Sequence, residues 1–449
     1  MRRRSPSADM SDNSAVQYLG GLRAWPTRLR ILAYYGRCLL RPRRYPQFIL
    51  GRSKGGLLST IATAKELHLR KYVKSDGGVR SSLTLPKWPS KPYDRMVGRG
   101  GLNINAAGTP FKRQVDHAIL AISRKCAYRC RHCYERSHIG SEEAVPVEAW
   151  KRTVRDLQAM GTGIIVFSGG EPLLRYDDLL DLLRSGDKAL SEFHIHTSGH
   201  GMTDGKAREL KAAGLEAAAV GLDDVDPGRH DALRGYPGAF QEALAAIGSL
   251  RRAGLFVSIN LCLTKELVRS GDLPALMDLA KDKGVGAIRF LEPVPVGGYQ
   301  GLPRAELFSD ADRTAATDFF LRVNGSRRYA RYPFISYEAY FEAPERLGCM
   351  MGGHSHFAVD ALGNVIPCVF LPVSFGNIMT EDLPAIVGRM REAIPRPCRG
   401  GCSAALLASS VSDAADHGRS FPVPFASMER EWRRLYPALR KAGPRSARI

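Results

Sequence analysis

The apolar positions between residues 117 and 291 follow two alternating periods. Short apolar runs predict strands at 118–122, 164–167, 193–196, 217–222, 255–263 and 287–291. Between them, apolar residues at helical spacing predict helices, several of which end at a glycine, over about 147–160, 173–183, 203–213, 238–252 and 272–283. Repeated strand and helix units of this kind predict an α/β fold with a parallel sheet, and six short strands suit a partial (β/α)6 barrel.

Candidate functional residues follow several of these strands. Cys126, Gly169, Ser198 and Asp223 each stand just after a predicted strand. In parallel α/β folds the loops at the carboxyl ends of the strands form the reactive site. We therefore expect these four positions to converge at one end of the barrel.

Three cysteines have the spacing C-x3-C-x2-C, at Cys126, Cys130 and Cys133. Three thiolates on one loop can hold three irons of a [4Fe-4S] cube, which leaves the fourth iron open. An open coordination position is typical of a catalytic metal site. The alternative is a zinc site with His132 as the fourth ligand. His132 and Cys133 are adjacent, however, whereas paired zinc ligands are normally two or more residues apart.

A second motif, Ser168-Gly-Gly-Glu-Pro172, follows the second strand. Together with the cysteine motif, it resembles the radical S-adenosylmethionine (SAM) enzymes. The resemblance implies that the three cysteines bind the [4Fe-4S] cluster whose open iron chelates SAM, and that Gly169, Gly170 and Glu171 bind the methionyl amine. It further implies reductive cleavage of SAM to a 5'-deoxyadenosyl radical, with electrons from a flavodoxin- or ferredoxin-like donor.

The same resemblance suggests further cofactor contacts. Tyr134 is the aromatic residue that follows the cysteine motif, and Ser198 stands near the ribose where relatives commonly have Asn. Arg234 matches the carboxylate of SAM, because a guanidinium pairs with a carboxylate fork, and Asn260 faces the cofactor. For Ser198, Arg234 and Asn260 the alternatives are a plain turn, a surface ion pair and a strand-end hydrogen bond.

A second cysteine group consists of Cys349, Cys368, Cys398 and Cys402. Residues 363–368 and 375–378 around it resemble the hairpin of the SPASM and twitch extensions of the radical SAM enzymes. The resemblance implies one auxiliary [4Fe-4S] cluster in a shortened, twitch-like domain. The alternative is zinc, for which His354 and His356 would supply nitrogen ligands. The two remaining cysteines, Cys38 and Cys262, stand outside both groups.

Charge divides the chain differently from hydrophobicity. The 449 residues carry a net charge of +20, and residues 1–100 contain 21 Lys and Arg against 5 Asp and Glu. We expect four segments, which are a basic N-terminal extension (1–112), a radical SAM core (113–300), a linker with the auxiliary domain (301–410) and a basic C-terminal tail (411–449).

The N-terminal extension mixes Leu, Ile, Tyr and Arg over residues 26–74. This pattern predicts a basic amphipathic helix, which either packs on the barrel or lies on a membrane surface or an acidic partner. Residues 75–112, rich in Gly, Pro and Ser, suggest a connector or lid. No apolar run is long enough for a membrane span, so we expect a cytoplasmic protein with optional peripheral contact at the inner membrane. Nucleic-acid binding is not expected, because no interleaved aromatic platform is present.

The predicted activity is hydrogen abstraction from an unactivated carbon of a small-molecule, lipid or cofactor-precursor substrate. The alternatives are a maturase of a ribosomally made peptide or protein, and an electron relay or sensor without turnover. The strand-rich pattern of a winged-helix recognition domain is not evident in the N-terminal extension. The turn at Glu292 is expected to line the substrate side. No catalytic residue is assigned, and candidates by residue type alone are Tyr299, Tyr337, Tyr340 and Glu338.

Overall fold

The computed structural model describes residues 16–41, 44, 71–99, 115–346, 348–394, 398, 401–416 and 421–440. In the predicted basic extension, residues 1–15, 42, 43 and 45–70 therefore lie outside the described residues. The same holds for residues 100–112 of the predicted connector and for residues 441–449 of the predicted tail.

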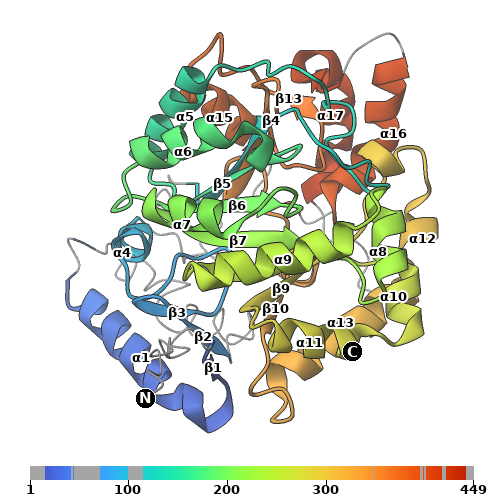
Figure 1. Ribbon diagram of the computed structural model, residues 1–449. Coiled ribbons are helices and arrows are strands. Elements are labelled where there is room, and N and C mark those ends of the chain that lie inside the picture. The colour runs from blue at the N-terminus through green and yellow to red at the C-terminus, as the bar shows by residue number, and fades with distance from the viewer. Residues whose placement is uncertain are drawn as a thin grey trace, which may run out of the picture.

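A nine-stranded sheet forms the centre of the molecule, in the order β10-β9-β8-β7-β6-β5-β4-β11-β12 (Figure 1). All six predicted strands are present and pair in parallel with their neighbours in sequence. They are β4 (His117–Ser123), β5 (Ile164–Gly169), β6 (Glu192–Thr197), β7 (Leu215–Gly221), β8 (Phe256–Cys262) and β9 (Ala287–Leu291). The predicted α/β class and parallel sheet are confirmed.

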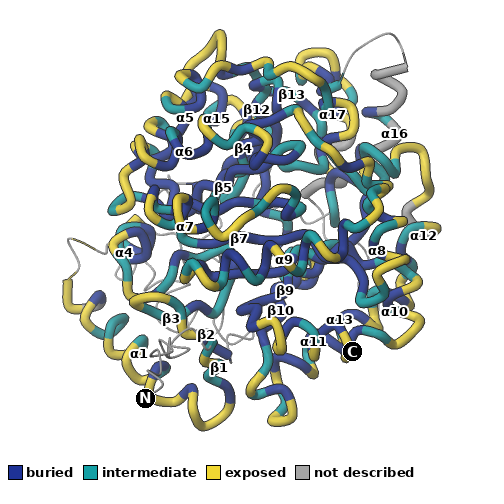
Figure 2. Tube along the Cα trace, viewed as in Figure 1, coloured by how far each residue is buried: buried dark blue, intermediate teal, exposed yellow. Residues whose placement is uncertain are grey.

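The five predicted helices also form, and two short helices add to them. They are α5 (Val147–Met160), η3 with α6 (Pro172–Arg175, Tyr176–Ser185), α7 (Asp204–Ala212), α8 (Pro227–Arg234), α9 (Ala239–Arg252), α10 (Lys265–Ser270) and α11 (Leu273–Asp282). Helix α5 ends at Gly161, whose φ of 92° only glycine adopts readily. Apolar residues of the helices and of the outward strand positions share one buried core (Figure 2).

The parallel sheet continues beyond residue 300. After η4 (Gly297–Tyr299), α12 (Arg304–Leu307) and α13 (Asp310–Gly325), strand β10 (Phe334–Tyr337) pairs in parallel with β9 and leads into α14 (Glu338–Phe341). Asn324 in α13 fixes this strand, since its side chain donates to and accepts from the backbone of Ile335. A segment predicted as linker therefore adds a strand to the barrel.

The C-terminal region is joined to the barrel by strand pairing. Strand β11 (His356–Val359) pairs in parallel with β4 and antiparallel with β12 (Val365–Ile366). The other elements are β13 (Val373–Ser374), α15 (Leu383–Ala393), α16 (Ser403–Asp416), β14 (Val423–Pro424) and α17 (Phe425–Arg440). Phe425 stacks on Phe375 and Trp432 is buried. Much of the segment predicted as a basic tail is thus helical and packs on the auxiliary domain.

The described part of the N-terminal extension closes the amino end of the barrel. Its elements are β1 (Tyr18–Leu19), η1 (Gly21–Ala24), α1 (Trp25–Leu39), β2 (Tyr72–Ser75), β3 (Gly78–Arg80) and α4 (Lys91–Gly98), with the three strands in one antiparallel sheet. Val73 and Leu83 pack on the first residues of the barrel strands, among them Phe256, Ala287 and Phe334.

This arrangement corrects two expectations about the extension. Residues 75–98 do not cover the carboxyl ends of the strands as a lid would, because they contact the amino ends. The extension also contains three strands, which its sequence did not suggest because each is only two to four residues long. Within the described ranges, no helix is long and apolar enough to cross a membrane.

Candidate functional site

The loop after β4 brings the cysteines of the C-x3-C-x2-C motif together at the carboxyl end of the barrel. Cys126, Cys130 and Cys133 are each half-buried and close enough for their charges to interact. Burial raises the pKa of the Cys126 thiol to about 11 and that of Cys133 to about 12. Iron binding would therefore have to displace protons from these thiols.

Glycines hold this cysteine loop by close backbone approach. A Cβ at Gly169, Gly170, Gly235 or Gly298 would lie only 2.1–2.6 Å from a carbonyl oxygen of residues 123–131. Since real Cβ atoms do not approach so closely, these positions exclude every side chain. Loops after β5, α8 and β9 thus clamp the backbone of the cysteine loop from several directions, and the three thiols on it are of the ligand type that an iron–sulfur cluster takes.

Glu171 ties the loop after β5 to the end of β6. Its carboxylate is fully buried and accepts hydrogen bonds from the hydroxyl groups of Thr197 (2.7 Å) and Ser198 (2.5 Å). The backbone N–H groups of Ser198 (2.8 Å) and Leu173 (3.1 Å) also donate to it. Burial raises the pKa of Glu171, against the effect of these donors. The predicted contacts of Glu171 with the methionyl amine and of Ser198 with the ribose stay predictions.

Arg234 lies between a carboxylate and a thiol. Its Nε atom is 2.6 Å from Oδ2 of Asp223, and its positive charge partly offsets the effect of burial, which raises the pKa of the Cys130 thiol. Although burial opposes ionisation, Arg234 and two histidines lower the pKa of Asp223. One of these, His132, has Nε2 3.9 Å from Asp223, and burial lowers its pKa to about 4. The structure thus places Arg234 at the site, and its pairing with the SAM carboxylate stays a prediction.

Asn260 and Tyr134 also border the site. The Oδ1 atom of Asn260 is buried and has no hydrogen-bond partner within the described part of the chain. A buried acceptor of this kind is costly unless a ligand or water donates to it. The hydroxyl of Tyr134 lies 3.2 Å from that of Ser168, the first residue of the Gly-Gly-Glu motif.

Polar residues on the inner face of the barrel form a group that the sequence interpretation missed. His117 in β4 stacks on His356 in β11 with ring centroids 5.2 Å apart. Arg289 in β9 lies 3.4 Å from the ring of His196 in β6 and 3.2 Å from the carboxylate of Glu338. A sequence signal was present in β6, where Glu192, His194 and His196 alternate with the apolar Phe193 and Ile195.

The second cysteine group also comes together, from segments far apart in the chain. Cys349 and Cys398 exchange two backbone hydrogen bonds of 2.9 Å. The thiol of Cys349 interacts electrostatically with Cys398 and Cys368, and that of Cys368 with Cys402. Burial raises the pKa of Cys368 to about 12. Four soft ligands that come together here, of which Cys398 is buried and the others are half-buried, fit an auxiliary iron–sulfur cluster.

The histidines of the zinc alternative have other contacts. His354 Nε2 is 2.9 Å from the carbonyl oxygen of Ile394, and His356 stacks on His117. The geometry therefore favours an all-cysteine site.

The auxiliary domain reaches the cysteine loop directly. The ring of Phe370, two residues after Cys368, contacts that of Tyr134 at 6.0 Å between centroids. Nearby, His138 is 2.8 Å from Glu135 and 3.8 Å from Asp360 of the auxiliary hairpin. The two cysteine groups are thus linked by side chains that follow Cys133 and Cys368 in sequence.

The four residues that are candidates for catalysis by residue type alone separate into two kinds. Tyr337 is fully buried and donates to Glu292 (2.7 Å), which also pairs with Arg313 (2.9 Å). Tyr340 is packed against Phe320. These residues support the wall behind β10. Tyr299 and Glu338 are partly exposed, and only they remain candidates for contact with substrate.

A parallel barrel with a three-cysteine loop at its carboxyl end and a four-cysteine auxiliary domain defines a class of iron–sulfur enzymes that use SAM. The family model of the radical SAM superfamily matches residues 120–270, and that of the SPASM iron–sulfur cluster-binding domain matches residues 349–403. The chain belongs to the radical SAM superfamily. Its cofactors are a SAM-binding [4Fe-4S] cluster, SAM and an auxiliary iron–sulfur cluster.

Relatives with assigned reactions cover much of the chain. It is 30% identical over 282 residues to the AdoMet-dependent heme synthase of Methanosarcina barkeri, spanning 58% of this chain and 78% of the relative. It is 29% identical over 256 residues to the PqqA peptide cyclase of Streptomyces rochei, spanning 56% and 68%. The structure of Streptococcus suis SuiB bound to SAM shares the fold, with a TM-score of 0.53, 16% identity and coverage of 72% and 81%.

Proposed function

We propose that this enzyme abstracts hydrogen from an unactivated carbon of a small, carboxylate-bearing cofactor precursor of the tetrapyrrole type. When bound, the cluster supplies the electron that cleaves SAM to methionine and a 5'-deoxyadenosyl radical. The observation that carries the proposal is the inner face of the barrel, which is closed at one end and lined by imidazole and guanidinium groups.

The closed end directs substrate toward the cysteine loop. At the amino end, Nη2 of Arg80 lies 2.7 Å from Oε2 of Glu192, and both side chains are buried. His194 binds the same carboxylate at 3.2 Å. With this end filled, the carboxyl end is the side from which a substrate can enter, and that side carries the cysteine loop.

The inner face of the barrel carries side chains that can bind an acidic group. Arg289 is permanently charged, and the pKa of its neighbour His196 is lowered well below its usual value, by burial and then by the charge of Arg289. A neutral imidazole beside a guanidinium would gain affinity for protons when a carboxylate arrives, because an opposite charge favours the ionised form. Glu338, now paired with Arg289, would be displaced by the substrate carboxylate or would share the guanidinium with it.

The relatives support this substrate class. The heme synthase of M. barkeri is named for a tetrapyrrole product, and the chain covers most of its length.

The test is anaerobic turnover with iron coproporphyrin III. We expect this compound to stimulate formation of 5'-deoxyadenosine and to lose mass itself. Arg289→Gln should raise the KM for the porphyrin with little change in uncoupled SAM cleavage, and Arg322→Gln, at an exposed position in α13, serves as the matched control. No stimulation by any carboxylated tetrapyrrole would refute the proposal.

The second candidate is a peptide maturase. It is favoured by the PqqA peptide cyclase relative and by the three-stranded N-terminal sheet, which could hold part of a precursor. Stimulation of the same assay by a precursor peptide, without stimulation by porphyrin, would select this function.

An acidic electron-transfer protein of the flavodoxin or ferredoxin type is the proposed reductant. Lys125, Arg129, Arg131 and Arg136 are exposed on the cysteine loop. Attraction between these basic residues and an acidic partner raises the rate of encounter and makes that rate sensitive to salt. Reduction by flavodoxin should therefore slow as ionic strength rises, whereas reduction by dithionite at matched ionic strength serves as the comparison.

A further inference from the structure

Helix α1 exposes an apolar stripe that no described segment covers. Of the nine large hydrophobic side chains exposed in the described part of the chain, five lie on or beside this helix. They are Leu22 (82% exposed), Trp25 (51%), Leu29 (57%), Leu32 (51%) and Leu40 (83%). The spacing of three, four, three and eight residues places them on one face.

The opposite face fixes the direction of this stripe. Cys38 is buried with Trp88, Tyr93 and Val97 of the α4 region, and Tyr34 packs against the same cluster. Because α1 is anchored through this face, the apolar stripe must point away from the barrel. Figure 1 shows α1 at the edge of the molecule, outside the layer formed by α4 and β3.

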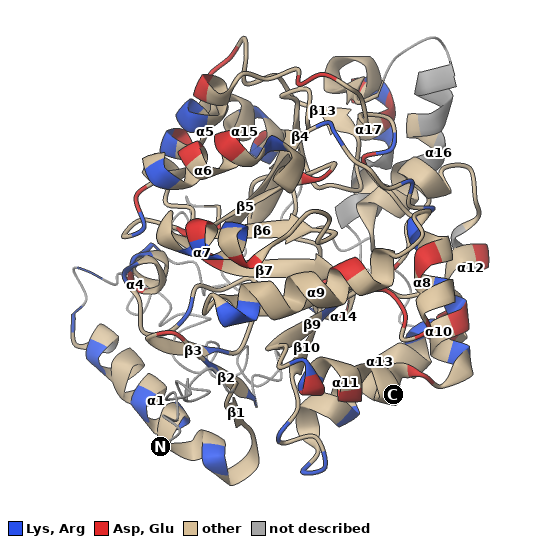
Figure 3. Ribbon diagram, in the orientation of Figure 1, with Lys and Arg blue, Asp and Glu red and all other residues tan. Residues whose placement is uncertain are grey.

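Charge on α1 and on the residues next to it in the chain has one sign. Residues 16–41 contain five Arg and no Lys, Asp or Glu. Arg23, Arg30, Arg37 and Arg41 recur at intervals of seven, seven and four residues, which places them along one flank of the stripe. Figure 3 shows basic and no acidic positions on α1.

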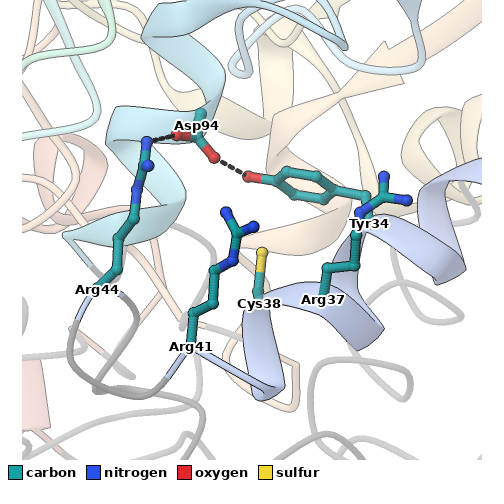
Figure 4. A pocket seen from close by; sticks show the side chains of 6 residues that line it. All are labelled: Tyr34, Arg37, Cys38, Arg41, Arg44 and Asp94. Carbon is teal, nitrogen blue, oxygen red and sulfur yellow. Dashed lines mark hydrogen bonds and ion pairs between the residues drawn. The ribbon is translucent and has the colours of Figure 1, made fainter.

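The arginine row ends in a pocket between α1 and α4. The pocket holds a cavity of about 210 Å³ and is lined by Tyr34, Arg37, Cys38, Arg41, Arg44 and Asp94 (Figure 4). Tyr34 donates to Asp94 (2.7 Å), and Arg44 pairs with the same carboxylate. Within the described residues, the guanidinium groups of Arg37 and Arg41 have no side-chain partner, so they can receive a phosphate.

We propose that α1 docks on a bilayer containing anionic phospholipid, with the apolar stripe in the headgroup and acyl boundary and a lipid phosphate in the arginine pocket. Apolar area and attraction to anionic lipid act together in such interfacial helices. The docking face belongs to the amino-end layer, and the cysteine loop lies at the carboxyl end of the strands. Attachment therefore leaves the reactive side accessible.

Vesicle flotation of the full-length protein tests the proposal. We expect binding to vesicles of phosphatidylcholine with about one third phosphatidylglycerol, and little binding to phosphatidylcholine alone. Leu29→Ser with Leu32→Ser, and separately Arg37→Glu with Arg41→Glu, should each weaken binding roughly tenfold or more. The controls are Met379→Ser and Arg322→Glu, exposed residues on other elements, which should bind as wild type does.

Trp25 supplies a direct readout. It is the only half-exposed tryptophan of the chain's four, since Trp88, Trp150 and Trp432 are buried. Bromine-labelled acyl chains in the anionic vesicles should quench its emission, and Trp25→Phe should abolish the quenching.

Four results would overturn the proposal. The first two are absence of binding by the wild type and unchanged binding by both α1 variants. The third is self-association in lipid-free solution that the leucine variant abolishes, which would show that a second copy of the chain covers the stripe. The fourth is displacement from vesicles by inorganic phosphate alone at millimolar concentration, which would assign the pocket to a free anion.

Discussion

The two ends of the barrel are built by opposite means. At the carboxyl end, glycines let loops approach the cysteine loop backbone to backbone, and polar atoms such as Asn260 Oδ1 are left without partners among the described residues. At the amino end, large apolar side chains and the buried Arg80–Glu192 pair fill the space. The carboxyl end leaves room for ligands, whereas the amino end is filled by side chains that stabilise the fold. The contrast predicts which substitutions affect chemistry and which affect folding.

The largest effect is expected at the carboxyl end. Replacing Cys126, Cys130 and Cys133 with Ala should abolish 5'-deoxyadenosine formation, because no thiolate would remain for the SAM-binding cluster. The variant should fold and keep about four irons per chain at the auxiliary site. Iron analysis and chromatography of the anaerobic reaction check both points.

Cys38→Ala is the matched control, because Cys38 is buried far from both groups. It should retain iron at both sites. Continued SAM cleavage by the triple variant would contradict the site, and loss of all iron would contradict an independent auxiliary cluster.

At the amino end, Arg80→Met should lower stability by about 3–5 kcal/mol, the cost of leaving a buried charge unpaired. The SAM cleavage rate per folded molecule should stay near that of wild type. Chemical denaturation of matched samples measures the change. Arg433→Met, which removes a surface pair with Glu429, should cost less than about 1 kcal/mol.

The same pair contributes to the stability of the wild type in a way that is lost in acid. Although burial opposes ionisation, Arg80 and His194 lower the pKa of Glu192 to about 2. Stability from this shift is present above the carboxyl group's unfolded pKa, about 4.3, and is lost as pH falls toward 2. Arg80→Met should flatten this part of the stability profile.

The smallest effect is expected at Lys71, which also lies at the amino end. Burial lowers its pKa to about 7. Between pH 7 and the unfolded pKa, about 10.4, the unfolded chain binds the extra proton, so stability rises with pH. Lys71→Met should be more stable than wild type near pH 7 and should flatten that rise. Lys74→Met, at an exposed position of β2 three residues further along the chain, is the control, and an unchanged slope in Lys71→Met would contradict the assignment.

Local patterns predicted the elements of the core well. Apolar runs and terminal glycines located all six strands from 117 to 291, because the strand and helix periods depend on neighbouring residues. Strands β10 and β11 were missed, since each has only four residues and joins the barrel through partners distant in sequence.

The features of the site also fall into local ones, which the sequence predicts, and long-range ones, which it does not. The cysteine spacing and the Gly-Gly-Glu motif are contiguous, and the sequence by itself determined the superfamily and its cofactors. Only the tertiary structure decided that Arg234 meets Asp223 and that His196 meets Arg289 inside the barrel. It also decided that the basic extension covers the amino end, because such contacts depend on register and burial between segments that the sequence separates by many residues.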